Sequence, residues 1–132
     1  MKRNYYLLDT HALIFWNNQF SMSNEFIKFL DKQNQIGTLY VSSISFWEIA
    51  LLVKKQKLAL SDIHAWKNEL INNTNITIAE PTVSEMINST LLPDHHKDPF
   101  DRLLIAQANQ QEFFLVTQDQ TIQKYKVKQF WM

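Results

Sequence analysis

Cysteine is absent from the 132-residue sequence, and glycine occurs only once, at Gly37. Without cysteine the chain cannot form disulfides, zinc ribbons or iron–sulfur clusters, so any metal ion must be held by oxygen or imidazole ligands. A single glycine excludes the loops that cradle nucleotide phosphates, because those loops need several glycines close together. Neither sign of charge is in excess, with 13 Lys and Arg against 13 Asp and Glu. A role with nucleic acid would therefore depend on local patches of charge.

Long apolar runs are also missing, since no stretch approaches the roughly 18 residues that a membrane-spanning helix needs. Asp9 follows the first apolar residues too early for the apolar region of a secretory signal. The composition, 45% hydrophobic and 20% charged, is typical of a folded globular protein. A chain of this length can form one domain with a real core but not two. We therefore expect a single domain over residues 1–132, located in the cytoplasm and not in a membrane.

Short apolar runs alternate with segments of helical periodicity along the sequence. Strands are predicted at 5–8, 39–41, 76–79, 113–117 and 127–131, and helices at 10–16, 23–36, 45–53, 61–73, 81–91 and 98–110. Strands separated by helices form right-handed βαβ units, which build a parallel sheet covered by helices on both faces. The predicted fold class is therefore α/β with a mostly parallel central sheet.

Four carboxylates occur close to predicted strand ends: Asp9, Glu48, Asp101 and Asp119. Ligands of parallel sheets bind outside the carboxyl ends of the strands, so we expect these acids to share one acidic cup. Carboxylates that repel one another favour a bound cation, and oxygen ligands without cysteine or paired histidine favour Mg²⁺ or Mn²⁺ over zinc. A metal-activated water beside such a cup is the chemistry of phosphodiester hydrolysis.

Helix capping is an alternative explanation for each of these acids. Ser45 and Glu48 fit a capping box, and Asp98 before Pro99 fits an N-cap, with Asp101 in the first turn that follows. Asp9 and Asp119 could each cap a short helix as well. Capping does not explain an acid near every strand end, because Ser and Asn cap equally well, so the joint pattern favours a site. Asp98 alone is fully explained as a cap, and we expect it to support the site from behind the metal ligands.

Cations near the acids would supply the positive charge that an anionic substrate needs. We expect three of them to contact that substrate: Lys54, Lys97 and Arg102. His95 and His96 are adjacent and cannot both face one metal from a regular helix, so we expect solvated loop histidines. Trp47 and Phe100, on the helices that carry acids, are expected in the core. Lys124, Lys126 and Lys128 alternate, which predicts one solvated side of the last strand.

Several segments together resemble a known family. They are Leu7–Leu13, Ser43–Ala50, His96–Ala108 and Val116–Asp119, with a closing Tyr125-Lys126-Val127 and Trp131. In this order and over essentially the full length, the sequence resembles the PIN-domain proteins, and especially the VapC-type toxins of bacterial type II toxin–antitoxin modules. The run from Asp98 to Arg102, Asp-Pro-Phe-Asp-Arg, is the most specific part of the match.

The resemblance implies a three-layer α/β/α sandwich and an Mg²⁺- or Mn²⁺-dependent endoribonuclease. It also implies an RNA substrate, with tRNA as one candidate, a homodimer, and a cognate VapB-type antitoxin that blocks the acidic site. The implied roles are metal ligands for Asp9 and Asp101, a further ligand or water-positioning acid for Glu48, and the fourth acid for Asp119. Thr10 would support Asp9, and Thr117 would orient Asp119, whose neighbours Gln118 and Gln120 depart from the family pattern.

Two other interpretations remain open at this point. A catalytically inactive PIN-like binding module would keep the acids as helix caps. A phosphoacceptor receiver domain would also place acids and Mg²⁺ at parallel strand ends, but it requires paired acids after the first strand and a lysine after a late one. Here Asp9 is followed by Thr10, and Thr117 by Gln118, so the receiver interpretation is disfavoured.

Overall fold

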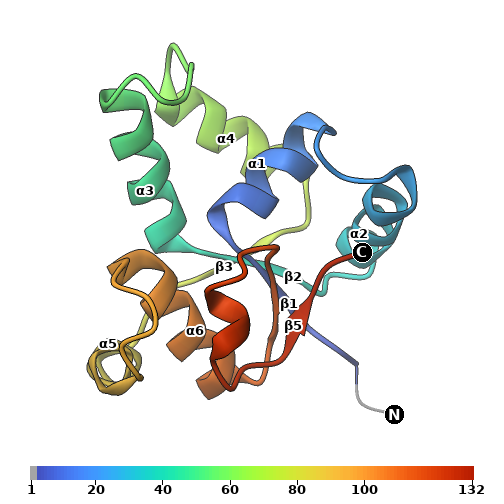
Figure 1. The fold of residues 1–132 in the computed structure, drawn as a ribbon. Coiled ribbons are helices and arrows are strands. Elements are labelled where there is room, and N and C mark those ends of the chain that lie inside the picture. Colours follow the sequence, from blue (N-terminus) through green and yellow to red (C-terminus); the bar gives the residue numbers. More distant parts are fainter. Residues whose placement is uncertain (1–2) are drawn as a thin grey trace.

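The computed structural model describes residues 3–132, which form a parallel sheet with helices on both faces (Figure 1). The strands are β1 (Tyr6–Leu8), β2 (Leu39–Ser42), β3 (Thr77–Ala79), β4 (Phe114–Val116) and β5 (Gln129–Phe130). The helices are α1 (Thr10–Asn18), α2 (Asn24–Gln35), α3 (Ser43–Lys54), α4 (Ile63–Asn73), α5 (Val83–Leu91) and α6 (Pro99–Gln111), followed by the short 3-10 helix η1 (Ile122–Lys124). None of the helices in this part of the chain is long and apolar enough to cross a membrane.

The sheet has the strand order β3-β2-β1-β4-β5, and every neighbouring pair is parallel. Leu8, the last residue of β1, is in register with Val41 of β2 on one side and Val116 of β4 on the other. The chain moves from β1 to β2 and later returns to β4 on the opposite side of β1. This reversal beside β1 is the switch point at which parallel α/β sheets bind ligands. The predicted α/β class with three layers is confirmed.

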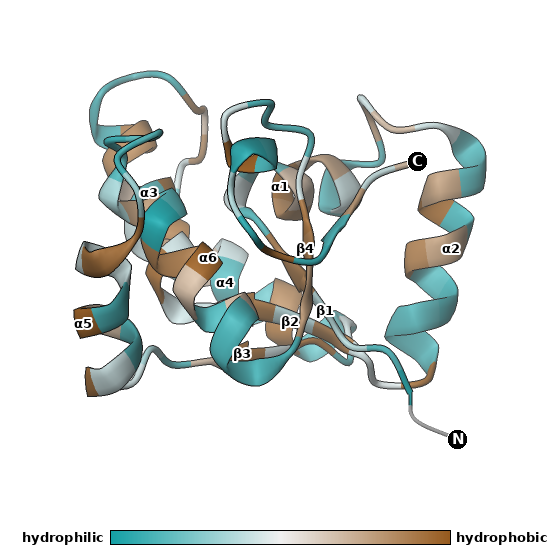
Figure 2. Cartoon of the chain, turned by 60° about the horizontal axis from the view of Figure 1, so that its bottom comes forward, coloured by the Kyte–Doolittle hydropathy of each residue, from teal (hydrophilic) through white to brown (hydrophobic). Residues whose placement is uncertain are grey.

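Alternating side chains of β1 divide the core into two halves. Tyr6 and Leu8 face one apolar cluster, which α1, α2, α3 and α4 complete. Leu7 faces the other, together with Leu104 of α6 and Ile122 of η1. In Figure 2 the apolar colour accordingly runs through β1, β2 and β4 in the interior. A central strand buried on both faces explains why its sequence reads as a continuous apolar run.

Helix α3 begins earlier than the sequence pattern indicated. Its N-cap is Ser42, whose side chain accepts a hydrogen bond from the Ile44 amide at 3.2 Å. The capping-box alternative for Ser45 and Glu48 is therefore excluded, and Glu48 lies in the second turn of α3 rather than in the first turn as predicted. Ser45 and Ile49 are buried on one side of α3, which turns Trp47 to the opposite side, where it is 61% exposed.

The prediction that Trp47 belongs to the core is thus wrong. Phe100 is half-buried, and its ring packs edge-on against Trp47 with centroids 5.2 Å apart. The last strand is also shorter than predicted, so Lys124, Lys126 and Lys128 precede β5 and do not alternate along it. A capping box occurs instead at α5, where Thr82 and Glu85 exchange hydrogen bonds of 3.1 and 2.8 Å.

Candidate active site

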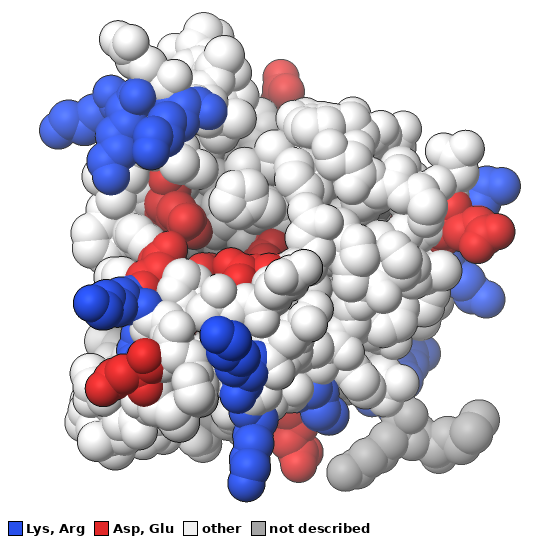
Figure 3. All heavy atoms as spheres, viewed as in Figure 1, with Lys and Arg blue, Asp and Glu red and all other residues white. Residues whose placement is uncertain are grey.

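A cleft of about 370 Å³ opens at the carboxyl edge of the sheet. It is lined by Asp9, His11, Phe15, Glu48, His96, Asp98, Asp101, Gln118 and Asp119. Figure 3 shows acidic atoms gathered in a hollow at the middle of this face, with basic side chains at its margins. The fold therefore brings the four predicted acids to one cleft, although they come from four separate segments of the chain.

Asp9 follows β1 directly and is fixed on several sides. Its Oδ1 accepts a hydrogen bond from the Ala12 amide at 2.7 Å and caps α1, while its own amide donates to the Val116 carbonyl at 3.1 Å. Only 7% of the residue is exposed. Burial raises the pKa of Asp9 above its usual value, against the lowering effect of hydrogen bonds from Thr117 and Ala12. Capping and a place in the cleft are thus compatible for this residue.

Asp101 lies in the first turn of α6, which Asp98 caps by accepting a hydrogen bond from the Phe100 amide at 2.9 Å. The predicted cap at Asp98 is confirmed. Burial, together with the negative charges of Asp98, Asp9 and Glu48, raises the pKa of Asp101 to about 7, while His96 lowers it. The carboxylates therefore repel one another, and a cation in the cleft would relieve that repulsion.

Glu48 reaches the cleft from α3 and is held by a hydroxyl pair. Thr10 donates to Glu48 Oε1 at 2.6 Å and lies 3.0 Å from the Ser45 hydroxyl oxygen. Because a hydroxyl has one hydrogen, a Thr10 that donates to Glu48 accepts from Ser45. The resemblance implied that Thr10 supports Asp9, but its side chain instead orients Glu48.

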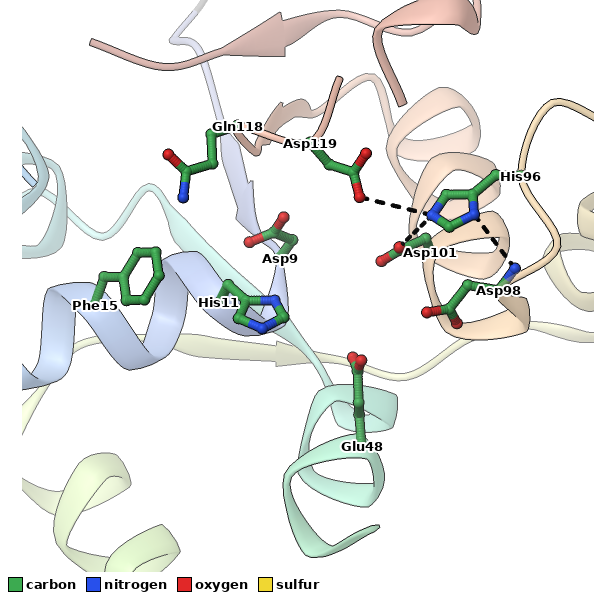
Figure 4. Close-up of a pocket in the computed structure, with 9 residues that line it drawn as sticks. All are labelled: Asp9, His11, Phe15, Glu48, His96, Asp98, Asp101, Gln118 and Asp119. Atoms are coloured by element: carbon green, nitrogen blue, oxygen red, sulfur yellow. Dashed lines mark hydrogen bonds and ion pairs between the residues drawn. The ribbon is translucent and has the colours of Figure 1, made fainter. Parts of the chain in front are cut away.

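His96 is the site residue that sequence reasoning missed. Its Nε2 lies 2.8 Å from Asp101 Oδ2 and 3.6 Å from Asp119 Oδ2, so the ring bridges two of the acids (Figure 4). Its Nδ1 faces the Asp98 amide at 3.4 Å and accepts from it, which places a hydrogen on Nε2. The expectation of a solvated loop histidine is wrong for His96, whose side chain is 21% exposed. The sequence offered one signal that His96 lies near the acids, namely its position two residues before the Asp98 cap.

Arg102 does not point into the cleft. Its guanidinium donates to the Thr90 carbonyl in the last turn of α5 at 3.5 Å and to three carbonyls of the loop between α5 and α6: Leu92 at 2.9 Å, Pro93 at 2.9 Å and His96 at 3.0 Å. It also donates to the Tyr125 hydroxyl at 3.3 Å, and only 11% of its side chain is exposed. With its donors engaged in this way, Arg102 holds the loop that carries His96, and its guanidinium lies outside the lining of the acidic cleft.

Thr117 links Asp9 to Asp119. Its hydroxyl accepts from the Asp119 amide at 3.1 Å, and its nearness to Asp9 lowers the pKa of that carboxyl group. Asp119 Oδ1 accepts from the Thr121 amide at 2.8 Å, which turns Oδ2 towards His96. Lys54 and Lys97 are exposed and lie outside the lining of the cleft.

The donor set of the cleft fits a hard divalent cation. His96, Asp98 and Asp101 each offer a ligand atom, and these atoms lie within 4.8 Å of one another. Asp9, Glu48 and Asp119 face the same cleft without joining this trio. Carboxylate oxygens with one imidazole and no thiolate are the ligands of Mg²⁺ or Mn²⁺ rather than of a structural zinc site.

Fold and cleft together define a parallel α/β protein with an acidic cleft at its topological switch point. The chain belongs to the PIN domain family, whose model matches residues 6–128. It is similar to "Ribonuclease VapC22" from Mycobacterium tuberculosis, with 27% identity over 126 residues that cover 91% of each protein.

Two solved structures share the fold. The DNA-bound VapBC from Salmonella typhimurium matches with a TM-score of 0.71 and 14% identity, over 96% of each chain. VapBC2 from Rickettsia felis, bound to a DNA fragment from its promoter, matches with a TM-score of 0.65 and 18% identity, over 92% of this chain and 93% of the other. At such identities the likeness concerns the fold.

Proposed function

We propose that the protein is an Mg²⁺- or Mn²⁺-dependent endoribonuclease and acts as the VapC-type toxin of a type II toxin–antitoxin module. The similarity to a protein named a ribonuclease over 91% of both chains supports the reaction class. The observation that carries the proposal is the cleft, in which four acids converge and the pKa of Asp101 is raised to about 7. Helix capping does not require such convergence.

The chain's own residues prepare this site for a phosphodiester. A bound divalent cation lowers the pKa of water and neutralises charge on a phosphate. Asp9, Asp101, Glu48 and Asp119 would hold it, with His96 and Asp98 beside Asp101. Thr10 holds Glu48, the Ala12 amide holds Asp9, and the Thr117 hydroxyl accepts from the Asp119 amide. The exposed Lys54 and Lys97 would contact RNA phosphates at the margins of the cleft.

Replacing Asp101 by asparagine tests the reaction. We expect Asp101→Asn to abolish metal-dependent RNA cleavage while the protein remains folded, because asparagine can still accept the His96 hydrogen bond. Cleavage of a labelled RNA with Mg²⁺, with Mn²⁺ and with EDTA measures the effect, and circular dichroism checks the fold. Equal cleavage by wild type and Asp101→Asn would refute the assignment. A wild type that cuts no RNA under any of these conditions would favour the inactive binding module.

An antitoxin partner is the second part of the proposal. Structural neighbours of this chain were solved as VapBC assemblies. An apolar groove of about 520 Å³ lies between α3 and α4, with Phe46, Trp47 and Leu60 in its lining. Trp47 adjoins Glu48 in the sequence, so a polypeptide seated on this groove would lie beside the acidic cleft. This groove is the surface that we assign to a VapB-type antitoxin.

Self-association is the third part. Helix α5 exposes Val83, Met86, Ile87 and Leu91, which are 73%, 50%, 55% and 74% exposed. Its one charged residue, Glu85, is buried, so the outer face of α5 carries no charge. An apolar, uncharged stripe can pair with its own copy across a two-fold axis, because neither repulsion nor a buried ion opposes the contact. We assign the homodimer interface to this face of α5.

A further inference from the structure

One wall of the cleft is aromatic rather than acidic. His11 and Phe15, one helical turn apart on α1, both line the cleft, and their ring centroids lie 6.1 Å apart. Phe20, just after α1, extends this row because its ring lies 5.3 Å from that of Phe15. The Phe20 side chain is 47% exposed although it is fully apolar. These three rings, the aromatic wall, form a track that leads away from the acids.

The aromatic wall also lacks the negative charge that dominates the rest of the cleft. Between Asp9 and Glu25 the sequence contains no Asp or Glu, and also no Lys or Arg. The exposed polar residues of this stretch include Asn17, Asn18 and Gln19, whose amides can donate hydrogen bonds. A polyanion that leaves the acidic centre along α1 would therefore meet rings and amide donors instead of further carboxylates.

The backbone holds Phe20 in its exposed position at some cost. Gln19 and Ser21, on either side of it, both adopt left-handed conformations, with φ of 55° and 58°. The Phe20 amide donates to the Phe15 carbonyl at 3.1 Å, which ties the two rings to each other. Gln19 is the C-cap of α1, where a left-handed residue is common, so the strained residue beside the exposed ring is Ser21.

We infer that the aromatic wall is a stacking surface for unpaired bases of the RNA substrate, next to the phosphate held at the acids. This inference rests on the proposed ribonuclease function and adds the form of RNA that the cleft accepts. Aromatic rings bind the faces of bases with little regard for sequence, and paired bases do not offer those faces. The Phe15 ring packs against both His11 and Phe20, so bases would lie on the outer faces of the rings and not between them.

Phe20 is the residue to change, because it is exposed and lies outside the acidic machinery. We expect Phe20→Leu, which keeps the apolar character but removes the ring, to raise KM for an unpaired RNA by about fivefold or more with kcat nearly unchanged. Phe20→Trp should keep the wild-type KM. Tyr5→Leu is the matched control, since Tyr5 is a 39% exposed aromatic residue that precedes β1, at the opposite edge of the sheet.

Binding is measured separately from cleavage with an unpaired RNA that carries 2-aminopurine, whose fluorescence falls on stacking. In the Asp101→Asn background, where we expect no cleavage, addition of protein should quench the probe, and Phe20→Leu should reduce the quenching. If Phe20→Leu and Tyr5→Leu behave alike while wild type cuts RNA, the aromatic wall proposal is overturned and the ribonuclease stands. An equal KM effect on fully paired RNA also overturns it. A wild type that neither binds nor cuts RNA overturns the proposed function itself.

Discussion

At the scale of single residues, Asp101 is the place where proton and cation compete. Its pKa of about 7 compares with 3.8 for an ordinary aspartate, so the folded protein holds this proton more tightly than the unfolded chain. Stability of the metal-free protein should therefore be greatest near pH 4 and should fall as the pH rises to about 7. We expect a loss on the order of 2–4 kcal/mol in the free energy of unfolding, measured by urea titration in EDTA.

The matched variant for this experiment is Asp101→Asn, which carries no titratable group at the position. Its stability should change much less over the same pH range, and above pH 7 it should exceed that of the wild type. Saturating Mg²⁺ should stabilise the wild type more at pH 8 than at pH 5, because the cation then displaces fewer protons. A full decline of stability in Asp101→Asn would show that another group is responsible.

Thr10 makes a second residue-scale prediction, because its buried hydroxyl is the hydrogen-bond donor to Glu48. Thr10→Val keeps the shape but leaves the Ser45 hydroxyl and the Glu48 carboxylate without this partner. We expect a loss of about 1–3 kcal/mol in stability and about a tenfold lower kcat, measured by urea titration and RNA cleavage. Thr10→Ser should retain both properties. A Thr10→Val protein with normal kcat would mean that the orientation of Glu48 does not matter for the reaction.

The acids of the cleft could be predicted from sequence because each lies close to a strand end or a helix start that local pattern reveals. His96 and Arg102 could not be predicted in the same way. His96 lies in an irregular loop and Arg102 on α6 bonds to that loop, so no periodicity tells which way either side chain points. Arg102 next to Asp101 suggests a substrate contact on the sequence alone, whereas in space its guanidinium meets four carbonyls of the chain itself.

At the scale of elements, the order of strands and helices was predictable from the sequence, but the side of a helix that is buried was not. Apolar runs identified the central strands β1, β2 and β4, since buried parallel strands have few polar residues. The face of α3 depended on where the helix begins. The sequence pattern predicted a helix that begins at Ser45, whereas Ser42 caps it, and this difference hid the exposure of Trp47. Tertiary contacts selected Ser42, because β2 ends there.

The loop between α5 and α6 makes an element-scale prediction. Lysine has three donors on a single nitrogen and cannot reproduce the fork with which Arg102 joins separate carbonyls of this loop. We expect Arg102→Lys to cost about 2–3 kcal/mol in stability and to increase proteolytic cutting near residues 90–97. Lys97→Gln, which changes an exposed cation in the same loop, is the control for charge. A stable Arg102→Lys protein with a raised KM for RNA would restore Arg102 as a substrate contact.

At the scale of the whole molecule, the two faces with unusual exposure lie on different helices and suit different partners. Trp47 and its groove are on α3 beside the acids, whereas the apolar stripe is on α5, which packs against α6. The antitoxin and the second copy of the chain could therefore bind at the same time. The net charge of zero leaves apolar contact as the main force for assembly.

The dimer interface assigned to α5 can be tested by introducing one charged residue into it. Ile87→Asp places a carboxylate at an apolar contact where each copy would bury it against its own equivalent, which is unfavourable for both. We expect wild type to sediment as a dimer and Ile87→Asp as a folded monomer, measured by analytical ultracentrifugation. Ile71→Asp on α4 is the matched control, because Ile71 is a 39% exposed isoleucine on another helix. A monomeric wild type, or equal dissociation by both variants, would contradict an interface on α5, since only Ile87 belongs to that uncharged stripe.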